Sequence, residues 1–465
     1  MHPELLTGWG RTSPTRAEVA SPRDAEELAG VLASAGPRGA LARGLGRSYG
    51  DAAQNAGGIV IDTGALATPM ELAADGTLHA GAGVSMDTLM RTFVPRGWFV
   101  PVTPGTRQVT VGGAVASDVH GKNHHVDGAI GAHLSEMTLV TPTGVYVLGP
   151  DDDLFWATVG GMGLTGVVTD VRLRMTAIET SAVVVDTDRT PDLDATMALM
   201  TEGDRDYRYS VAWIDCLSGG SRLGRSVLTR GDHAPVDALP VSRRGDPLRF
   251  SPRTLLAAPP WAPPGLLNSV TIRAFNEAWY RWAPRRERGA LHGLAGFFHP
   301  LDGVAGWNRL YGRRGFVQYQ LVLPFGQEDV LRRTIETLAG AGCPSFFGVL
   351  KRFGPPDPGH LSFPVPGWTL ALDLPIGPPG LGPLLDGLDA EVAGAGGRVY
   401  LAKDSRLRQE WIAQMYPRLD EWRAVRDKAD PDGVMRSDLS RRLGLLDGDE
   451  AGHGLPGGLS LAGLR

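Results

Sequence analysis

The chain has few cysteines and no long apolar run, and both absences exclude classes of protein. Its 465 residues contain only Cys216 and Cys343, which stand far apart and in no spacing typical of a zinc site. A disulfide framework is therefore excluded, while a single bridge between the two stays open. No window approaches the roughly 18 to 20 uncharged apolar residues of a membrane-spanning helix. We expect any contact with a membrane to be peripheral.

The chain also lacks net positive charge. Its formal charge is −5, so no broad basic surface is available to attract nucleic acid, and we expect no nucleic-acid partner. The first residues show no basic stretch followed by an apolar run, so we expect no secretory leader. These features favour the cytoplasm, with peripheral association at the inner membrane face. The periplasm is the alternative if a secreted partner carries the chain.

Length and composition predict two domains of mixed structure. A single core stops growing at roughly 250 to 300 residues, so a chain of 465 with 42% hydrophobic residues should divide. The 63 glycines and 35 prolines are spread at intervals suited to short strands and tight turns. This pattern favours α+β structure over a helical bundle.

Apolar periodicity places several elements. Ser21 and Pro22 open a predicted helix over 22–35, with Leu28, Val31 and Leu32 at helical spacing. Short apolar runs predict strands at 39–42, 58–62, 137–142, 145–148, 207–214, 316–322 and 368–373. The first 175 or so residues are expected to form one α+β unit, followed by a sheet-containing domain.

Two segments carry few regular signals. Residues 240–266 are rich in proline, which is typical of a surface linker; the alternative is a flap that presents Leu255, Leu256 and Trp261 to an apolar substrate. Residues 447–465 show neither helical nor strand period and are expected to form a disordered tail.

Glycine-rich loops are the strongest functional signal. Residues 43–50, 81–83, 104–125 and 160–166 all combine glycine with small or β-branched side chains, so their backbones can approach a large flat ligand closely. The first loop has G-x-G but lacks the third glycine of the dinucleotide fingerprint, so a simple Rossmann fold is excluded. One such loop is usually a tight turn, but several together indicate a shared cofactor.

In these loops the chain resembles the flavin oxidoreductases of the vanillyl-alcohol oxidase type. The match rests on residues 43–55, 104–125, 153–161 and 165–168. A narrower similarity, to a branch that oxidises a polyprenylphosphoryl ribose, rests on residues 6–12, 44–51, 120–125, 307–309, 316–320, 361–368 and 402–406. Together the resemblance covers about residues 5 to 446.

The resemblance implies an α+β fold in which FAD lies between two small subdomains, beside a substrate domain with a large antiparallel sheet. The implied limits are 1–183 for the FAD-binding domain, 184–397 for the substrate-binding domain and 398–446 for a return segment that completes the first. The residues implied to hold FAD are Arg43, Gly44, Leu45, Gly46, Arg47, Ser48, Tyr49, Gly50, Gly105, Thr110, Val111, Gly112, Gly113, Ser117, Asp118, Val119, His120, Val167 and Tyr400.

The mode of flavin attachment follows from one position. Members of this family can link FAD covalently to a histidine in the first loop, and this chain has Tyr49 there, so we expect the flavin to be noncovalent. His120, His124 and His125 could also be read as metal ligands. No carboxylate or cysteine completes a set, and we favour flavin-site hydrogen bonding and expect no metal.

The catalytic residues are implied by the same resemblance. Oxidation of an alcohol by flavin requires a base or hydrogen-bond network at the substrate hydroxyl, and Lys403 is the implied base. Gln318 and Gln320 share one face of a predicted strand, where two amides bond at the edge of a core or bind sugar hydroxyls; the resemblance favours the sugar. His120 and Tyr49 complete the catalytic set.

The resemblance also implies three substrate-binding residues, but this chain departs from the family at some positions of the site. Lys351 and Arg309 are candidates near a phosphate, and Phe298 for the wall of the site. Mycobacterial members of the branch have tyrosine where this chain has Phe298, and cysteine where it has Ala371. The change at Ala371 removes a thiol beside the flavin, so inhibitors that react with that sulfur should fail here.

The implied activity is FAD-dependent oxidation of the 2′-hydroxyl of a polyprenylphosphoryl-β-D-ribose to the 2′-keto sugar. This is the first half of an epimerisation to the arabinose form for cell-wall arabinan, which an NAD(P)H-dependent short-chain reductase would complete. A quinone or another acceptor would reoxidise the flavin. The alternatives are a flavin oxidase of a soluble sugar, nucleoside or alditol, and a flavin-binding protein without catalysis.

Overall fold

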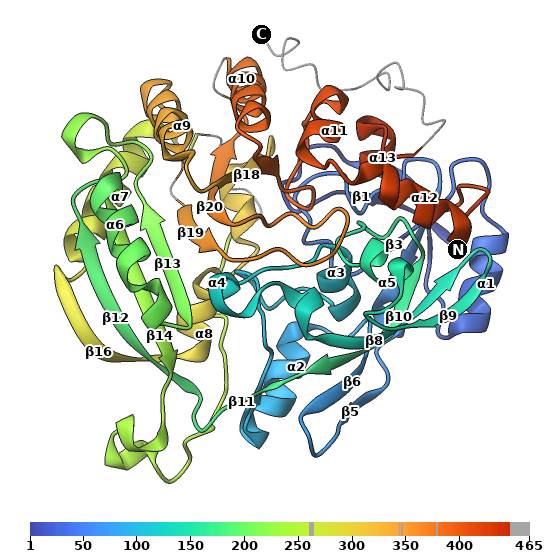
Figure 1. Ribbon diagram of the computed structural model, residues 1–465, viewed down its shortest axis with the longest axis horizontal. Helices are drawn as coiled ribbons and strands as arrows, with labels where there is room; N and C mark the ends of the chain where they lie inside the picture. The colour runs from blue at the N-terminus through green and yellow to red at the C-terminus, as the bar shows by residue number, and fades with distance from the viewer. Residues whose placement is uncertain (260–264, 344, 346, 378–379, 447–465) are drawn as a thin grey trace.

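The computed structural model describes residues 1–259, 265–343, 345, 347–377 and 380–446. Trp261 and the tail expected at 447–465 lie outside these residues. The chain forms an eight-stranded sheet and smaller sheets of four and five strands. Figure 1 shows the large sheet on one side of the molecule and these smaller sheets on the other, with a cluster of helices along one edge. The three sheets and their loops together surround the candidate site.

The first small sheet has four strands in the order β1 (His2–Leu6), β2 (Thr15–Ala20), β4 (Ile59–Asp62) and β3 (Ala40–Arg43). Strands β2 and β3 both run parallel to β4. Helix α1 (Ala25–Ala33) packs Leu28 and Leu32 against this sheet. The helix begins later than expected because Asp24, not Ser21, is its N-cap and accepts from Glu27 N at 2.9 Å.

The second small sheet is antiparallel throughout and carries the loops of the glycine-rich segments. Its strands, in spatial order, are β5 (Met70–Leu72), β6 (Thr77–Gly81), β10 (Val167–Arg174), β8 (Leu134–Thr141) and β9 (Gly144–Leu148). Its helices are α2 (Met86–Phe93), α3 (Val111–Ala116), α4 (His124–Asp127) and α5 (Asp153–Thr158). A two-stranded ribbon of β7 (Trp98–Phe99) and β11 (Thr176–Ala177) leads out of it.

The third sheet is large and antiparallel, as expected. Its strands, in spatial order, are β16 (Arg286–Gly293), β12 (Ala182–Thr190), β14 (Ser226–His233), β13 (Tyr209–Ile214), β19 (Gly348–Phe353), β20 (Gly367–Pro375), β18 (Phe316–Pro324) and β21 (Arg398–Val399). Helices α6 (Leu193–Gly203), α9 (Glu328–Gly340) and α10 (Leu381–Gly394) pack on one face through the largest apolar core. The opposite face is left to line a cavity.

Two helices and a pair of short strands connect strands of this sheet. Helix α7 (Ser269–Trp282) and helix α8 (Leu294–Phe298) flank β16, and strand β15 (Leu256–Ala257) pairs in parallel with β17 (Val304–Ala305). The predicted strands all form, each within three residues of its expected limits. The strands could be predicted because the alternation of apolar and polar residues that defines them involves only near neighbours in the sequence.

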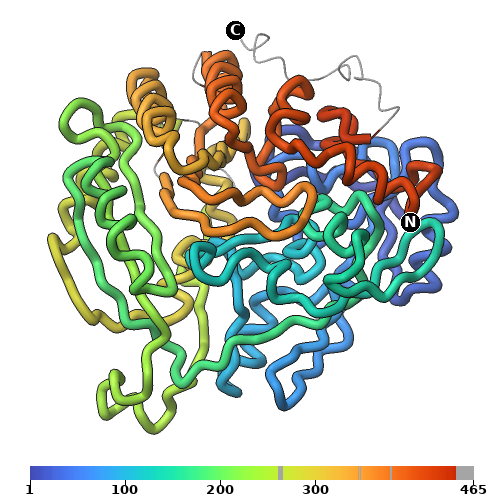
Figure 2. The backbone as a smooth tube through the Cα atoms, in the orientation of Figure 1, coloured from blue at the N-terminus to red at the C-terminus, as the bar shows by residue number. Residues whose placement is uncertain are grey.

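The C-terminal segment returns to the first sheet. It contains α11 (Ile412–Met415), α12 (Leu419–Ala429) and α13 (Asp438–Leu443), and Figure 2 traces it back beside the N-terminal strands. Met435 forms a parallel bridge with Ala40. Strand β12 begins at Ala182 and β21 belongs to the large sheet, so the limits proposed at 183 and 398 fall within sheet strands; the domain limits stay a prediction.

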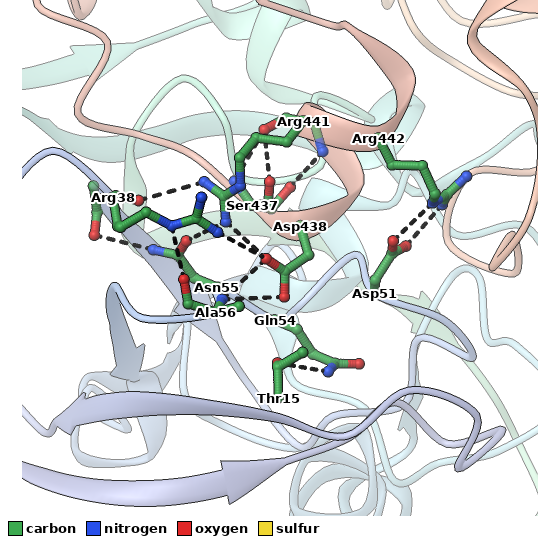
Figure 3. A network of polar contacts seen from close by, with 12 residues as sticks. Thr15, Arg38, Asp51, Gln54, Asn55, Ala56, Ser437, Asp438, Arg441 and Arg442 are labelled. Atoms are coloured by element: carbon green, nitrogen blue, oxygen red, sulfur yellow. Dashed lines mark hydrogen bonds and ion pairs between the residues drawn. The ribbon is translucent and has the colours of Figure 1, made fainter. Parts of the chain in front are cut away.

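Partly buried hydrogen bonds and ion pairs fasten this return. Figure 3 shows Arg441 donating to Asn55 Oδ1 at 2.6 Å and Arg442 donating to both Asp51 oxygens at 2.8 Å. Arg442 also lies 2.8 Å from Asp404 Oδ2, directly after Lys403. The first glycine loop and the Lys403 segment are therefore held by the same guanidinium.

Candidate active site

A cavity of about 990 Å³ lies between the glycine loops and the open face of the large sheet. Most of the residues expected from the sequence line it. They are Gly44, Leu45, Gly46, Arg47, Ser48, Tyr49, Gly105, Thr110, Gly112, Gly113, Ser117, Val119, His120, Phe298, Gln318, Gln320, Lys351, Tyr400 and Lys403. Six stretches of the chain, from residue 44 to residue 403, thus meet at one cavity.

The first loop offers its backbone to the cavity. Among the described residues, none accepts a hydrogen bond from the amides of Leu45, Gly46, Arg47 or Ser48. A Cβ on Gly44 would stand 2.1 Å from Thr110 Oγ1, so a side chain here would displace the neighbouring loop. Free consecutive amides beside a cavity suit an anionic group such as a pyrophosphate.

The second loop is packed against the second sheet. Thr110 caps α3 by accepting from Gly113 N at 3.1 Å, and a Cβ on Gly112 would lie 2.9 Å from Ala82 Cβ. Tyr400 donates to Ser117 O at 2.6 Å and stacks on Phe363, with ring centroids 4.7 Å apart. Main chain therefore lines much of this wall, which allows the close contact that a flat cofactor requires.

Six expected residues do not line the cavity: Arg43, Gly50, Val111, Asp118, Val167 and Arg309. Arg43 donates to Ala53 O and to Thr7 O, both at 2.8 Å, and so fastens the base of the first loop. Buried Asp118 accepts from Gly131 N at 3.2 Å and from the Ser362 hydroxyl. These residues shape the loops from behind.

Arg309 lies outside the lining set and approaches Ala258 O at 3.5 Å. Its place near a phosphate stays a prediction. Phe298 does line the cavity, with its ring 4.8 Å from Tyr209 and 5.1 Å from Phe99. Its contribution to the wall is wholly apolar.

The cavity floor is one row of cross-strand neighbours. The pairings run from Gln320 to Ala371, Val349, Trp213 and Val227 across β18, β20, β19, β13 and β14. All five residues line the cavity. The floor therefore begins at an amide and continues over apolar side chains toward α7.

Lysine is scarce in this chain, and three of its four lysines line the cavity. Lys122, Lys351 and Lys403 are the three, and Lys428 is exposed on α12; the other basic side chains are arginines. Burial lowers the pKa of Lys122 to about 7 and that of Lys351 to about 8. Arginine cannot titrate in this range, so these lysines can exchange a proton where an arginine could not.

Sequence reasoning did not include Lys122. Its ammonium donates to Phe297 O and lies 4.2 Å from the centroid of the Phe297 ring. The two residues that precede it in the sequence, His120 and Gly121, also line the cavity. The scarcity of lysine in the composition was the signal that could have found it.

Lys403 is buried beside one carboxyl group. Burial, opposed by attraction to Asp373 and helped by repulsion from Lys351, lowers the pKa of Lys403 to about 7. Burial likewise raises the pKa of Asp373 to about 7, against the effect of Gln318, Lys403 and Tyr311. Gln318 Nε2 donates to Asp373 Oδ1 at 2.5 Å. The cavity thus holds an amine that loses its proton near neutral pH.

His120 is held neutral. Burial lowers its pKa well below the usual value, and Lys351, His124 and Lys403 lower it further by repulsion. Gln320 Nε2 lies 2.9 Å from His120 Nε2 and can only donate, so Nε2 accepts and the ring proton is on Nδ1. His120 Nδ1 and Gln318 Oε1 have no hydrogen-bond partner among the described residues. Both are suited to a polar ligand in the cavity.

The neighbouring histidines have structural partners. His124 Nδ1 accepts from Gly354 N at 3.1 Å, and His125 Nε2 lies 3.0 Å from Tyr207 O. In the part of the chain that the structure describes, no group of three or more His, Cys, Asp or Glu residues is arranged to hold a metal ion. Nor does any described helix have the length and apolar character to cross a membrane.

Comparisons with known proteins agree with this site. The profile of the FAD binding domain family matches residues 17–149, and that of the D-arabinono-1,4-lactone oxidase family matches residues 386–443. The first match contains both glycine loops, and the second contains Tyr400 and Lys403. The fold and the site therefore define an FAD-dependent oxidoreductase of the vanillyl-alcohol oxidase type.

Three related proteins show to which family within this class the chain belongs. The decaprenylphosphoryl-β-D-ribose oxidase of Mycolicibacterium smegmatis is 46% identical over 451 residues, 95% of this chain and 97% of the relative. An uncharacterized Streptomyces coelicolor protein from the mprA 5′ region is 44% identical over 78% of this chain and all of its own length. A Streptomyces alditol oxidase is 33% identical over 36% of this chain and 41% of its own length. The chain belongs to the decaprenylphosphoryl-β-D-ribose oxidase family.

Proposed function

We propose that this enzyme oxidises the 2′-hydroxyl of a polyprenylphosphoryl-β-D-ribose to the 2′-keto sugar, as the first half of an epimerisation to arabinose for cell-wall arabinan. The observation that carries the proposal is the mixed character of one cavity, which combines three lysines and two glutamine amides with a row of apolar strand residues. A sugar phosphate with a prenyl tail has the same mixed character.

FAD, when bound, accepts the hydride that leaves the sugar carbon. We assign its pyrophosphate to the free amides of the first loop and its flavin ring to the wall formed by Ser117, Val119, His120 and Tyr400. Tyr49 stands in place of a linking histidine and its hydroxyl is buried, with a pKa raised well above the usual value by that burial. The flavin is proposed to be noncovalent.

The substrate hydroxyls are assigned to the polar end of the floor. Lys403 Nζ, deprotonated above about pH 7, takes the proton of the 2′-hydroxyl. Gln318 Oε1 and the Nδ1 proton of His120 orient the sugar, while Gln320 fixes the His120 tautomer. The phosphate pairs with Lys351 and Lys122, since no carboxylate in the described part of the chain affects the pKa of either lysine.

The proposed reaction also requires a second enzyme and an electron acceptor. A short-chain reductase that uses NAD(P)H would reduce the keto sugar, and a quinone or another acceptor would reoxidise the flavin. Because the substrate is a lipid, the enzyme would associate peripherally with a membrane, at the cytoplasmic face or, alternatively, in the periplasm. The domain limits 1–183, 184–397 and 398–446 are part of the same proposal.

Anaerobic bleaching of the flavin absorbance tests the substrate. We expect a short-chain prenylphosphoryl ribose to bleach it rapidly, and free ribose, ribose 5-phosphate and alditols to bleach it slowly. The partial match to an alditol oxidase makes alditols the informative comparison. Faster bleaching by an alditol or free pentose would overturn the lipid substrate in favour of a soluble one.

A further inference from the structure

An apolar rim surrounds one mouth of the cavity. On α7, Phe275, Trp279 and Trp282 recur at i, i+4 and i+7, so they share one face of the helix. Phe275 and Trp279 also line the cavity, stacked at 6.1 Å between centroids. Trp282 is 83% exposed, well beyond what a core residue shows. The face thus runs continuously from the cavity to the surface.

Two further segments extend the same rim. Leu255 and Leu256 are 77% and 68% exposed on and beside β15, whose partner strand contributes Val304 to the cavity lining. Leu266 is 44% exposed, and the adjacent Leu267 packs with Val304 on the cluster that contains Tyr49. We call Leu255, Leu256, Leu266 and Trp282, with Trp279 at its inner edge, the rim.

The helix is oriented by a polar network on its other side. Asn276 donates to Asp215 Oδ1 at 2.8 Å, and Glu277 pairs with Arg225 at 2.7 Å. Asp215 and Arg225 are themselves buried and bonded at 2.8 Å. Because this network fixes the polar face of α7 to the large sheet, the aromatic face is left at the mouth of the cavity.

The charge around the rim has the opposite sign to that of the chain. Described residues 249–259 and 265–288 contain seven arginines and two glutamates, with no lysine or aspartate, for a net +5 against −5 overall. Arg253, Arg273, Arg285 and Arg286 are exposed. Exposed tryptophan and leucine interspersed with arginine match the boundary between headgroups and acyl chains of an anionic bilayer.

We propose that the rim docks on the surface of an anionic lipid bilayer, so that the cavity opens directly into the membrane and a lipid substrate enters without crossing water. This inference rests on the proposed function for the identity of the substrate, but the docking itself does not require it. The apolar floor from Val349 to Val227 continues the acyl environment toward the polar end of the cavity.

Flotation with lipid vesicles tests the docking on the FAD-loaded full chain. We expect the enzyme to float with vesicles of equal phosphatidylglycerol and phosphatidylcholine, and to float poorly with phosphatidylcholine alone or in about 1 M salt, where charges are screened beyond about 3 Å. The double variant Leu256→Ser/Trp282→Ser should reduce bound protein roughly tenfold, since two interfacial side chains lose their apolar contact. Neither residue lines the cavity.

A matched control comes from the opposite side of the molecule. Val145 and Val147 on β9 are 56% and 65% exposed, and Val145→Ser/Val147→Ser should float like the wild type. Equal flotation of wild type and the Leu256/Trp282 variant, with both retaining their flavin spectrum, would overturn the proposal. So would a change from dimer to monomer in light scattering of that variant without lipid, because the rim would then be an interface between two copies.

Turnover separates this inference from the proposed function. The Leu256/Trp282 variant should oxidise a short-chain prenylphosphoryl ribose in solution at the wild-type rate and lose at least several-fold on a long-chain substrate embedded in vesicles. Vesicle binding without oxidation of either substrate would overturn the proposed function alone. Oxidation in solution without vesicle binding would overturn the docking alone.

Discussion

The ammonium nitrogen of Lys403 lies 4.0 Å from the centroid of the Tyr49 ring. The two residues come from opposite ends of the chain, and the backbone joins them as well, because Tyr49 N donates to Ala402 O at 3.0 Å. A Cβ on Gly50 would lie 2.0 Å from Asp404 O. The segments that contain Tyr49 and Lys403 can therefore approach each other this closely only because position 50 is glycine. The proposed base is thus held against the proposed cofactor loop.

Removal of the base should abolish most of the activity. Lys403→Met is expected to lower the rate of flavin reduction roughly 10²- to 10⁴-fold, the usual contribution of a positioned base. The wild-type rate should rise with pH through about 7 and then level, since the neutral amine is the active form. Stopped-flow reduction across pH checks both results. Lys428→Met, on the exposed lysine, is the control.

Two substitutions should move that pH profile in opposite directions. Lys351 lowers the pKa of Lys403 by repulsion, so Lys351→Met should move the profile to higher pH. Asp373 raises the same pKa by attraction, so Asp373→Asn should move it to lower pH. Profiles of flavin reduction with saturating substrate measure the shifts. Movement of both variants in one direction would contradict the assignment of Lys403 as the base.

Lys122 should act on affinity and not on the chemical step. Its loss in Lys122→Met is expected to raise KM for a prenylphosphoryl ribose roughly 10- to 100-fold, as for other charge-assisted hydrogen bonds to phosphate. The limiting rate should change little, because Lys122 is not assigned to the hydroxyl. Steady-state kinetics with the phosphorylated substrate and with its uncharged prenyl riboside distinguish the two effects. Equal losses on both substrates would rule out phosphate binding by this residue.

The ion-paired return segment should stabilise the fold. Burial by itself would raise the pKa of Asp404, but Arg442 and the amides of Arg406 and Leu407 hold it below its usual value. Because this folded pKa is depressed, the stability it contributes is present above the unfolded pKa near 4 and is lost as the pH falls through the folded value. Arg442→Met should cost about 3 kcal/mol at pH 7, measured by urea denaturation, with less loss in acid.

The cavity of the wild type should contain no reactive thiol. Cys216 and Cys343 are both buried and neither lines the cavity, whereas Ala371 does. Ala371→Cys should therefore gain one rapid maleimide adduct by mass spectrometry, and the wild type and Ala371→Ser should gain none while folded. Rapid labelling of the wild type would show that one of its native cysteines is accessible.

Local chemistry made much of the site predictable. Gly44 lies close to Thr110 and Gly112 lies close to Ala82, so neither position has room for a side chain. A need of this kind can be seen in the sequence, because only glycine meets it. Gln318 and Gln320 share a face because strand side chains alternate. Spacing along the chain does not show that the Arg309 guanidinium turns toward Ala258, and its place near a phosphate stays a prediction.

The sequence by itself determined the strands, the glycine loops and the polar residues of β18, because each depends on neighbours within a few positions. Only the tertiary structure decided that Lys122, Lys351 and Lys403 share one cavity, that Asp373 lies close enough to act on Lys403, and that the apolar floor leads to α7. The physical reason is that a lysine's pKa depends on burial and on charges brought close by folding, whereas its place in the sequence records neither.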